Sequence, residues 1–278
     1  MPTPTQTELK AQMERLLKQL DKQTKTSKKN RGYYTGDDCA IPEAVVKAKL
    51  RKAYRLLMPM SEAPWGSLIV DSVQDRLEVT GIRSGDDGVD AAIWSQGWQA
   101  NQMDAESPLA HNAALVDGRV YATVWPGDDD QPEIVLDDAT QMAVEYREGR
   151  HKVRHRVAAL RRWKDDDETE HVTLYRPEGI YKFTEAKEQG RAAGRIKAGE
   201  KWWEKREIDG EPWPVPNPWG VLNVVEIAIN RRLAPGRFLD ARGEFANCLG
   251  LIDRINLLTF LGLVVAFWMG FPLRGVIG

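Results

Sequence analysis

The middle third of the chain is a series of short apolar segments separated by turn residues, and this pattern limits the possible folds most strongly. The turns at 127–130 and 177–179 are rich in Asp, Gly and Pro. Evenly spaced short strands with such turns are typical of an antiparallel meander. We predict strands at 120–125, 133–136, 143–147, 152–163, 171–175, 179–184, 201–207 and 223–229.

Helical periodicity dominates both ends of the chain. Leu9, Met13, Leu16, Leu17 and Leu20 recur at spacings of three and four, which predicts an amphipathic helix at 8–23. We predict a polar linker at 24–31, a turn at 33–38, helices at 42–57, 65–73, 89–104 and 107–117, and a strand at 78–82. A last, long helix is predicted from about Asp240 to Met269. Together these elements predict an α+β fold.

Charge and motif content argue against several classes of function. Lys plus Arg number 39 against 41 Asp plus Glu, so the chain lacks the basic character of a dedicated nucleic-acid binder. Its two cysteines fit a reducing compartment. No phosphate-binding loop, H-E-x-x-H motif or G-x-S-x-G motif occurs, and His151 and His155 have no obvious third metal ligand. We therefore predict no catalytic residues, no metal and no cofactor.

The long C-terminal helix has two physical interpretations. Its apolar positions lie close to a three-and-four spacing, which suits packing along one seam. It is either a core helix with a polar interruption, or a subunit-interface helix in which Asn256 fixes the register. The candidate interface residues are Phe245, Leu249, Ile252, Asp253, Arg254, Asn256, Leu263 and Phe267.

Three stretches in a fixed order carry a family resemblance. They are 55–83, 217–231, and 251–256 continuing to 271–278. In this order they resemble the portal proteins of siphovirus-like bacteriophages that infect actinobacteria, from about residue 33 onward. The motif positions that we single out are Asp71, Asp75, Arg76, Pro218, Gly220 and Asn230.

The resemblance implies a structural subunit of a ring, expected to be a dodecamer, at one vertex of the capsid. It implies an N-terminal helix and linker (1–32), an α+β wing (33–239), and a stem helix with the start of the clip (240–278). The implied partners are the terminase large subunit, capsid or scaffold proteins and head-completion proteins. Double-stranded DNA would pass through without sequence readout. The implied location is the virion, with assembly in the host cytoplasm.

Two expectations qualify this interpretation. Portal proteins of this kind are considerably longer, so we expect a form truncated before the clip and the second stem helix. Residues 257–273 also contain no charged side chain in 17 positions, which is near the lower limit for a membrane span. The alternative is therefore a membrane-associated phage or prophage protein anchored by this segment.

Overall fold

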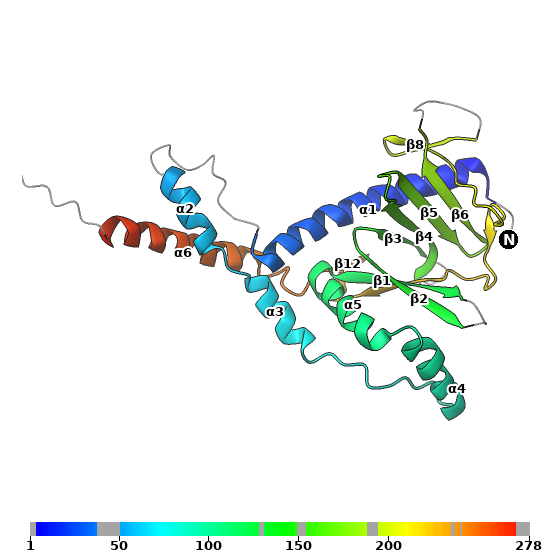
Figure 1. Ribbon diagram of the computed structural model, residues 1–278, viewed down its shortest axis with the longest axis horizontal. Coiled ribbons are helices and arrows are strands. Elements are labelled where there is room, and N and C mark those ends of the chain that lie inside the picture. Colours follow the sequence, from blue (N-terminus) through cyan, green and yellow to red (C-terminus); the bar gives the residue numbers. More distant parts are fainter. Residues whose placement is uncertain are drawn as a thin grey trace, which may run out of the picture.

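The computed structural model describes residues 4–37, 51–127, 131–148, 154–187, 194–234, 237–239 and 241–270. A β-rich body is crossed by one long helix, α1 (Gln6–Thr35), as Figure 1 shows. Helices α2 (Arg51–Ser61) and α6 (Leu249–Gly270) pack together and extend away from this body. The predicted α+β class is confirmed.

Two antiparallel sheets form the body. The larger has the order β3-β4-β5-β6-β8-β7, with β9 also paired to β6. Its strands are β3 (Met142–Glu148), β4 (Arg154–Lys164), β5 (Glu170–Arg176), β6 (Gly179–Glu185), β7 (Ile196–Ala198), β8 (Lys201–Lys205) and β9 (Val215–Pro216). The smaller has the order β10-β1-β2, comprising β10 (Val224–Ala228), β1 (Arg119–Pro126) and β2 (Pro132–Asp138). A hairpin joins β11 (Arg232–Ala234) to β12 (Arg237–Leu239).

Strands β3 to β6 form the predicted antiparallel meander, and both faces of this sheet are buried. On one face Ala158 and Leu160 pack with the apolar residues of α1. On the other face Ala159 packs with Tyr121 and Val224 of the smaller sheet. Because successive side chains point to opposite faces of a strand, burial of both faces produces consecutive buried residues in β4. The larger sheet is therefore the central layer of the body.

The predicted linker at 24–31 is wrong, because α1 continues through it to Thr35. The helix ends where Gly36 adopts a left-handed conformation and its N–H bonds to the carbonyl of Gly32. Ser27, Asn30 and Tyr33 are buried, so the inner face of the helix continues with polar residues instead of leucines. The polar composition of 24–31 predicts a linker, whereas in the structure these residues meet polar groups of α5 and of the turn after β2.

The central helices differ in part from expectation. Helix α3 (Trp65–Gln74) is confirmed, whereas 78–82 forms no strand. Helix α4 (Asp87–Ala92) runs into the π-helix η3 (Ile93–Gln99). Helix α5 (Met103–Asp117) starts before residue 107, where a helix is predicted to begin, so Pro108 lies inside it. The predicted start of a helix at residue 42 lies outside the described residues, and α2 continues beyond residue 57 to Ser61.

The long C-terminal helix begins later than predicted, at Leu249 rather than near Asp240. Residues 241–243 have no regular structure, and 244–248 form turns beside the end of α5. The backbone N–H of Glu244 donates to the carbonyl of Leu115, on α5, at 2.7 Å. This bond replaces the bond within the same helix that the predicted helix would require. Phe245 therefore lies in a turn before α6 and not on the helix.

Candidate assembly site

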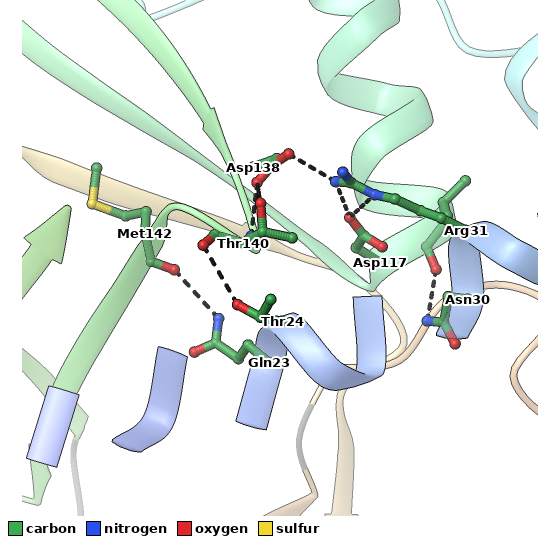
Figure 2. Close-up of polar contacts among 9 residues, drawn as sticks. Gln23, Thr24, Asn30, Arg31, Asp117, Asp138, Thr140 and Met142 are labelled. Carbon is green, nitrogen blue, oxygen red and sulfur yellow. Dashed lines mark hydrogen bonds and ion pairs between the residues drawn. The ribbon is translucent and has the colours of Figure 1, made fainter. Parts of the chain in front are cut away.

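The polar half of α1 forms a junction with α5 and with the turn between β2 and β3, which Figure 2 shows in detail. The Asn30 side chain donates to the carbonyl of Val116 at 2.9 Å. The Gln23 amide donates to Tyr121 Oη at 2.8 Å and to the carbonyl of Met142 at 3.4 Å. Side-chain amides thus satisfy backbone carbonyls where the apolar core ends.

Arg31 binds two carboxylates at the centre of this junction. Its Nη2 lies 2.7 Å from Asp117 and 2.8 Å from Asp138 (Figure 2). Burial raises the pKa of Asp117 above its ordinary value, although Arg31 opposes this effect. Burial also tends to raise the pKa of Asp138, but hydrogen bonds from Thr140 and Arg31 prevail and lower it. Asp138 is therefore the carboxylate that the junction stabilises in its charged form.

Replacing Asp138 by asparagine should destabilise the fold by about 1–2 kcal/mol at neutral pH, because charge-assisted hydrogen bonds are lost. A carboxyl whose folded pKa is lowered contributes stability above its unfolded pKa and loses it as pH falls through the folded pKa. The difference between parent and variant should thus be full above the ordinary value of 3.8 and disappear below it. Urea unfolding from pH 2.5 to 7 measures this, with the exposed Asp166→Asn as control. A difference independent of pH would contradict the prediction.

A second polar cluster joins the two sheets around Glu226 of β10, whose side chain is 2% exposed. Its carboxylate binds Arg119 Nη1 at 3.1 Å, within the smaller sheet. It also accepts from the hydroxyl of Tyr146, on the larger sheet, and pairs with Arg231. Burial, followed by the hydrogen bond to Glu226, raises the pKa of Tyr146, so this hydroxyl stays a donor at neutral pH.

The segment that leads into α6 crosses closely over the end of α5. A Cβ atom on Gly243 would lie 2.2 Å from the carbonyl oxygen of Val116, and one on Gly118 would lie 2.7 Å from the backbone of Arg242. Asn230 fixes the same crossing, because its amide donates to Glu244 at 2.8 Å. This crossing determines where α6 leaves the β-rich body.

Helices α2 and α6 form what we call the helical arm. Tyr54 of α2 meets Phe260 of α6 edge-on, with ring centroids 5.6 Å apart, and Leu57 and Met58 complete the contact. Nearer the body, Ile252 packs in a buried cluster with Val70 of α3. One side of α6 is therefore packed within the chain.

The opposite side of α6 is apolar and exposed. Leu251, Leu258, Leu261 and Val265 are exposed by 56%, 68%, 48% and 54%, and Arg254 lies among them. These five positions follow a three-and-four spacing, which places them on one stripe of the helix. We call this set the outer stripe. By length and apolar character, α6 is also the one helix of the described residues that could cross a membrane.

The residues predicted for a subunit interface lie in different surroundings. Arg254 is exposed, Phe267 is 37% exposed, and Leu249 and Leu263 pack partly against buried clusters. Asp253 accepts a hydrogen bond of 2.6 Å from the Tyr33 hydroxyl. The buried members are Phe245, Ile252 and Asn256. No contact in the structure tests their role between subunits, so the assignment stays a prediction.

The family-motif positions do not form a single site. Asp71 accepts from the Tyr34 hydroxyl at 3.0 Å, Asp75 caps the C-terminus of α3, and Arg76 is exposed beyond it. Pro218 and Gly220 lie in an exposed turn, in which Gly220 has a φ of +62°. Asn230 lies at the crossing that leads into α6.

Sequence reasoning missed the two polar clusters, one around Arg31 and one around Glu226. Arg31, Asp117 and Asp138 are separated in sequence, and charged residues are too common in this chain to select them. In the sequence Glu226 is an ordinary strand residue, and its burial results from the packing of the larger sheet on the smaller one. A signal did exist in α1, because Ser27 and Asn30 continue the three-and-four spacing that begins at Leu9.

An exposed apolar stripe on a projecting helix is typical of a subunit that assembles with other chains. Residues 13–260 match the family described as phage portal protein, SPP1 Gp6-like. The chain is 28% identical over 232 residues to the portal protein of Mycobacterium phage L5, covering 80% of this chain and 42% of that protein. It is 33% identical over 168 residues to the portal protein of Mycobacterium phage D29, covering 56% and 32%.

The chain therefore belongs to the SPP1 Gp6-like family of phage portal proteins. The resemblance noted in the sequence is confirmed, including the likeness to proteins of phages that infect actinobacteria. The chain spans less than half of the length of the curated relatives that it matches.

Proposed function

We propose that this chain is a structural subunit of a portal ring, which forms the channel at one capsid vertex for DNA packaging and ejection. The observation that carries the proposal is the family match over residues 13–260, which includes the β-rich body and half of α6. The exposed outer stripe of α6 supports it, because a ring subunit needs apolar surface for its neighbours.

We assign the parts of the chain to portal domains according to the resemblance. Residues 33–239 form the wing and 240–270 the stem-like segment, with 271–278 as the start of the clip. Helix α1 packs on the central sheet, so it contributes to the core of the wing even though most of it precedes residue 33. We propose that α6 contacts neighbouring subunits while its inner face, which includes Ile252 and Asn256, stays packed within its own chain.

The proposed partners are those of a portal vertex: other copies of this chain in a ring of about a dozen, the terminase large subunit, capsid or scaffold proteins and head-completion proteins. DNA would pass without sequence readout, through contacts with backbone phosphates. The net charge of −2 supports weak and local contacts of this kind. The proposed location is the capsid vertex, after assembly in the host cytoplasm.

Membrane anchoring is the second candidate, and it rests on the length and apolar character of α6. Purification without detergent, followed by light scattering, separates the two functions. A ring subunit should be recovered in buffer without detergent. Its measured mass should be that of a defined oligomer, which is a multiple of 31.4 kDa. Recovery only from membranes, and only with detergent, would replace the ring proposal by the membrane alternative.

A further inference from the structure

We propose that the base of the outer stripe on one copy docks into a groove beside α3 of the next copy in the ring. The occupant of the groove is thus a second copy of this chain. The inference rests on the proposed function and specifies which two surfaces meet.

The groove has a volume of about 480 Å³ and runs along the outer face of α3. Its apolar lining includes Pro64, Trp65 and Leu68, and the two large side chains are 37% and 62% exposed. Asp71 and Asp75 line the same groove. They are four residues apart, so their carboxylates lie on one side of the helix. The groove therefore combines exposed apolar surface with negative charge.

The base of the outer stripe has the complementary character. Leu251 and Leu258 are exposed on either side of Arg254, which is itself exposed. Within the described residues, Arg254 has neither an ion-pair nor a hydrogen-bond partner. An exposed guanidinium between two leucines matches two carboxylates beside Trp65 and Leu68. A guanidinium with five donors can bind both carboxylates at once.

The spacing of the two surfaces also agrees. Leu68, Asp71 and Asp75 are separated by three and four residues, as are Leu251, Arg254 and Leu258. Side chains at such spacings form one stripe along a helix, and stripes of this kind pack against one another in helix pairs. The groove beside α3 and the base of the outer stripe therefore agree in the spacing of their side chains as well as in charge.

The two surfaces face away from a common core. Val70 on the inner face of α3 and Ile252 on the inner face of α6 belong to the same buried cluster. The groove and the outer stripe are thus different patches on the outer faces of these helices. A contact between two different patches is head-to-tail, and its repetition about an axis gives a closed ring when the rotation between neighbours divides a full turn. This is the type of contact that the proposed function requires.

Charge reversal tests the pairing. Asp75→Arg and Arg254→Asp should each raise the protein concentration needed for ring assembly by at least about tenfold, because each places like charges together. The double variant restores an opposite-charge pair, so its assembly should return to within about threefold of the parent. Light scattering across a concentration series measures assembly. Circular dichroism during heating checks that each variant folds.

Asp166→Arg is the matched control, because Asp166 is exposed in the turn between β4 and β5 and lies far along the chain from both helices. It should assemble like the parent. The pairing is overturned if the single variants also assemble like the parent, or if the double variant remains as impaired as they are while rings of the parent form. A parent that stays monomeric at every concentration would overturn the ring proposal together with the pairing.

Discussion

Replacing Glu226 by alanine is expected to lower the free energy of unfolding by about 3–5 kcal/mol, the largest single effect that we predict. The glutamate is 2% exposed, and its partner Arg119 has a side chain that is 7% exposed. Removing the carboxylate takes the Glu226 ion pair away from the buried guanidinium of Arg119. The Tyr146 hydroxyl loses its acceptor at the same time. The loss should therefore exceed that of an exposed ion pair by several-fold.

Glu133→Ala is the matched control for this prediction. Glu133 lies on β2 of the same small sheet and is exposed, so its removal should change stability by less than about 0.5 kcal/mol. Equilibrium urea unfolding, followed by circular dichroism, measures both variants. Equal losses for Glu133→Ala and Glu226→Ala would show that the buried cluster does not hold the two sheets together.

Replacing Gly243 by alanine should cost on the order of 3 kcal/mol, because the added methyl group collides with backbone. Its Cβ would lie 2.2 Å from the carbonyl oxygen of Val116 and 3.1 Å from the carbonyl carbon. Backbone at the end of α5 has little freedom to move, since Glu244 N–H is bonded to the carbonyl of Leu115. The crossing would open, and α6 would lose its fixed exit from the body. Thermal unfolding measures the loss.

Gly250→Ala provides a control of opposite sign on the neighbouring helix. No atom would lie within 4 Å of a Cβ at Gly250, which is the second residue of α6. Alanine favours a helix over glycine by up to about 1 kcal/mol, so this variant should be slightly more stable than the parent. A stabilised Gly243→Ala variant would contradict the close crossing.

The strands of the meander could be predicted from the sequence because the residues that define each strand and turn are neighbours along the chain. Each strand from β1 to β6 carries its own apolar run and its own turn, so β3 to β6 follow one another as a meander. The boundaries of α1 and α6 could not be predicted, because long-range contacts decide them. The helix continues through its polar half where Asn30 donates to Val116 of α5 and Thr24 donates to Thr140 in the turn after β2. Residues 244–248 form turns, and the N–H of Glu244 donates to the carbonyl of Leu115 of α5.

The candidate site could be predicted in part. The sequence identified α6 and its spacing, and one of its two interpretations, a core helix with a polar interruption, describes the inner face around Asn256. It could not show that a second stripe with the same spacing stays exposed, because α6 is apolar on nearly all sides. The packing of α2 against Phe260 and of α3 against Ile252 determines which stripe is covered. Arg254, one of the predicted interface residues, lies within the exposed stripe.

Electron microscopy of the purified chain, without detergent, tests the central claim most directly. We predict closed rings with a channel along the symmetry axis, built from copies in which α6 contacts a neighbour. End-on averages with rotational symmetry would match this account. Single copies or open filaments at concentrations up to the solubility limit would contradict the claim that this chain is a ring subunit.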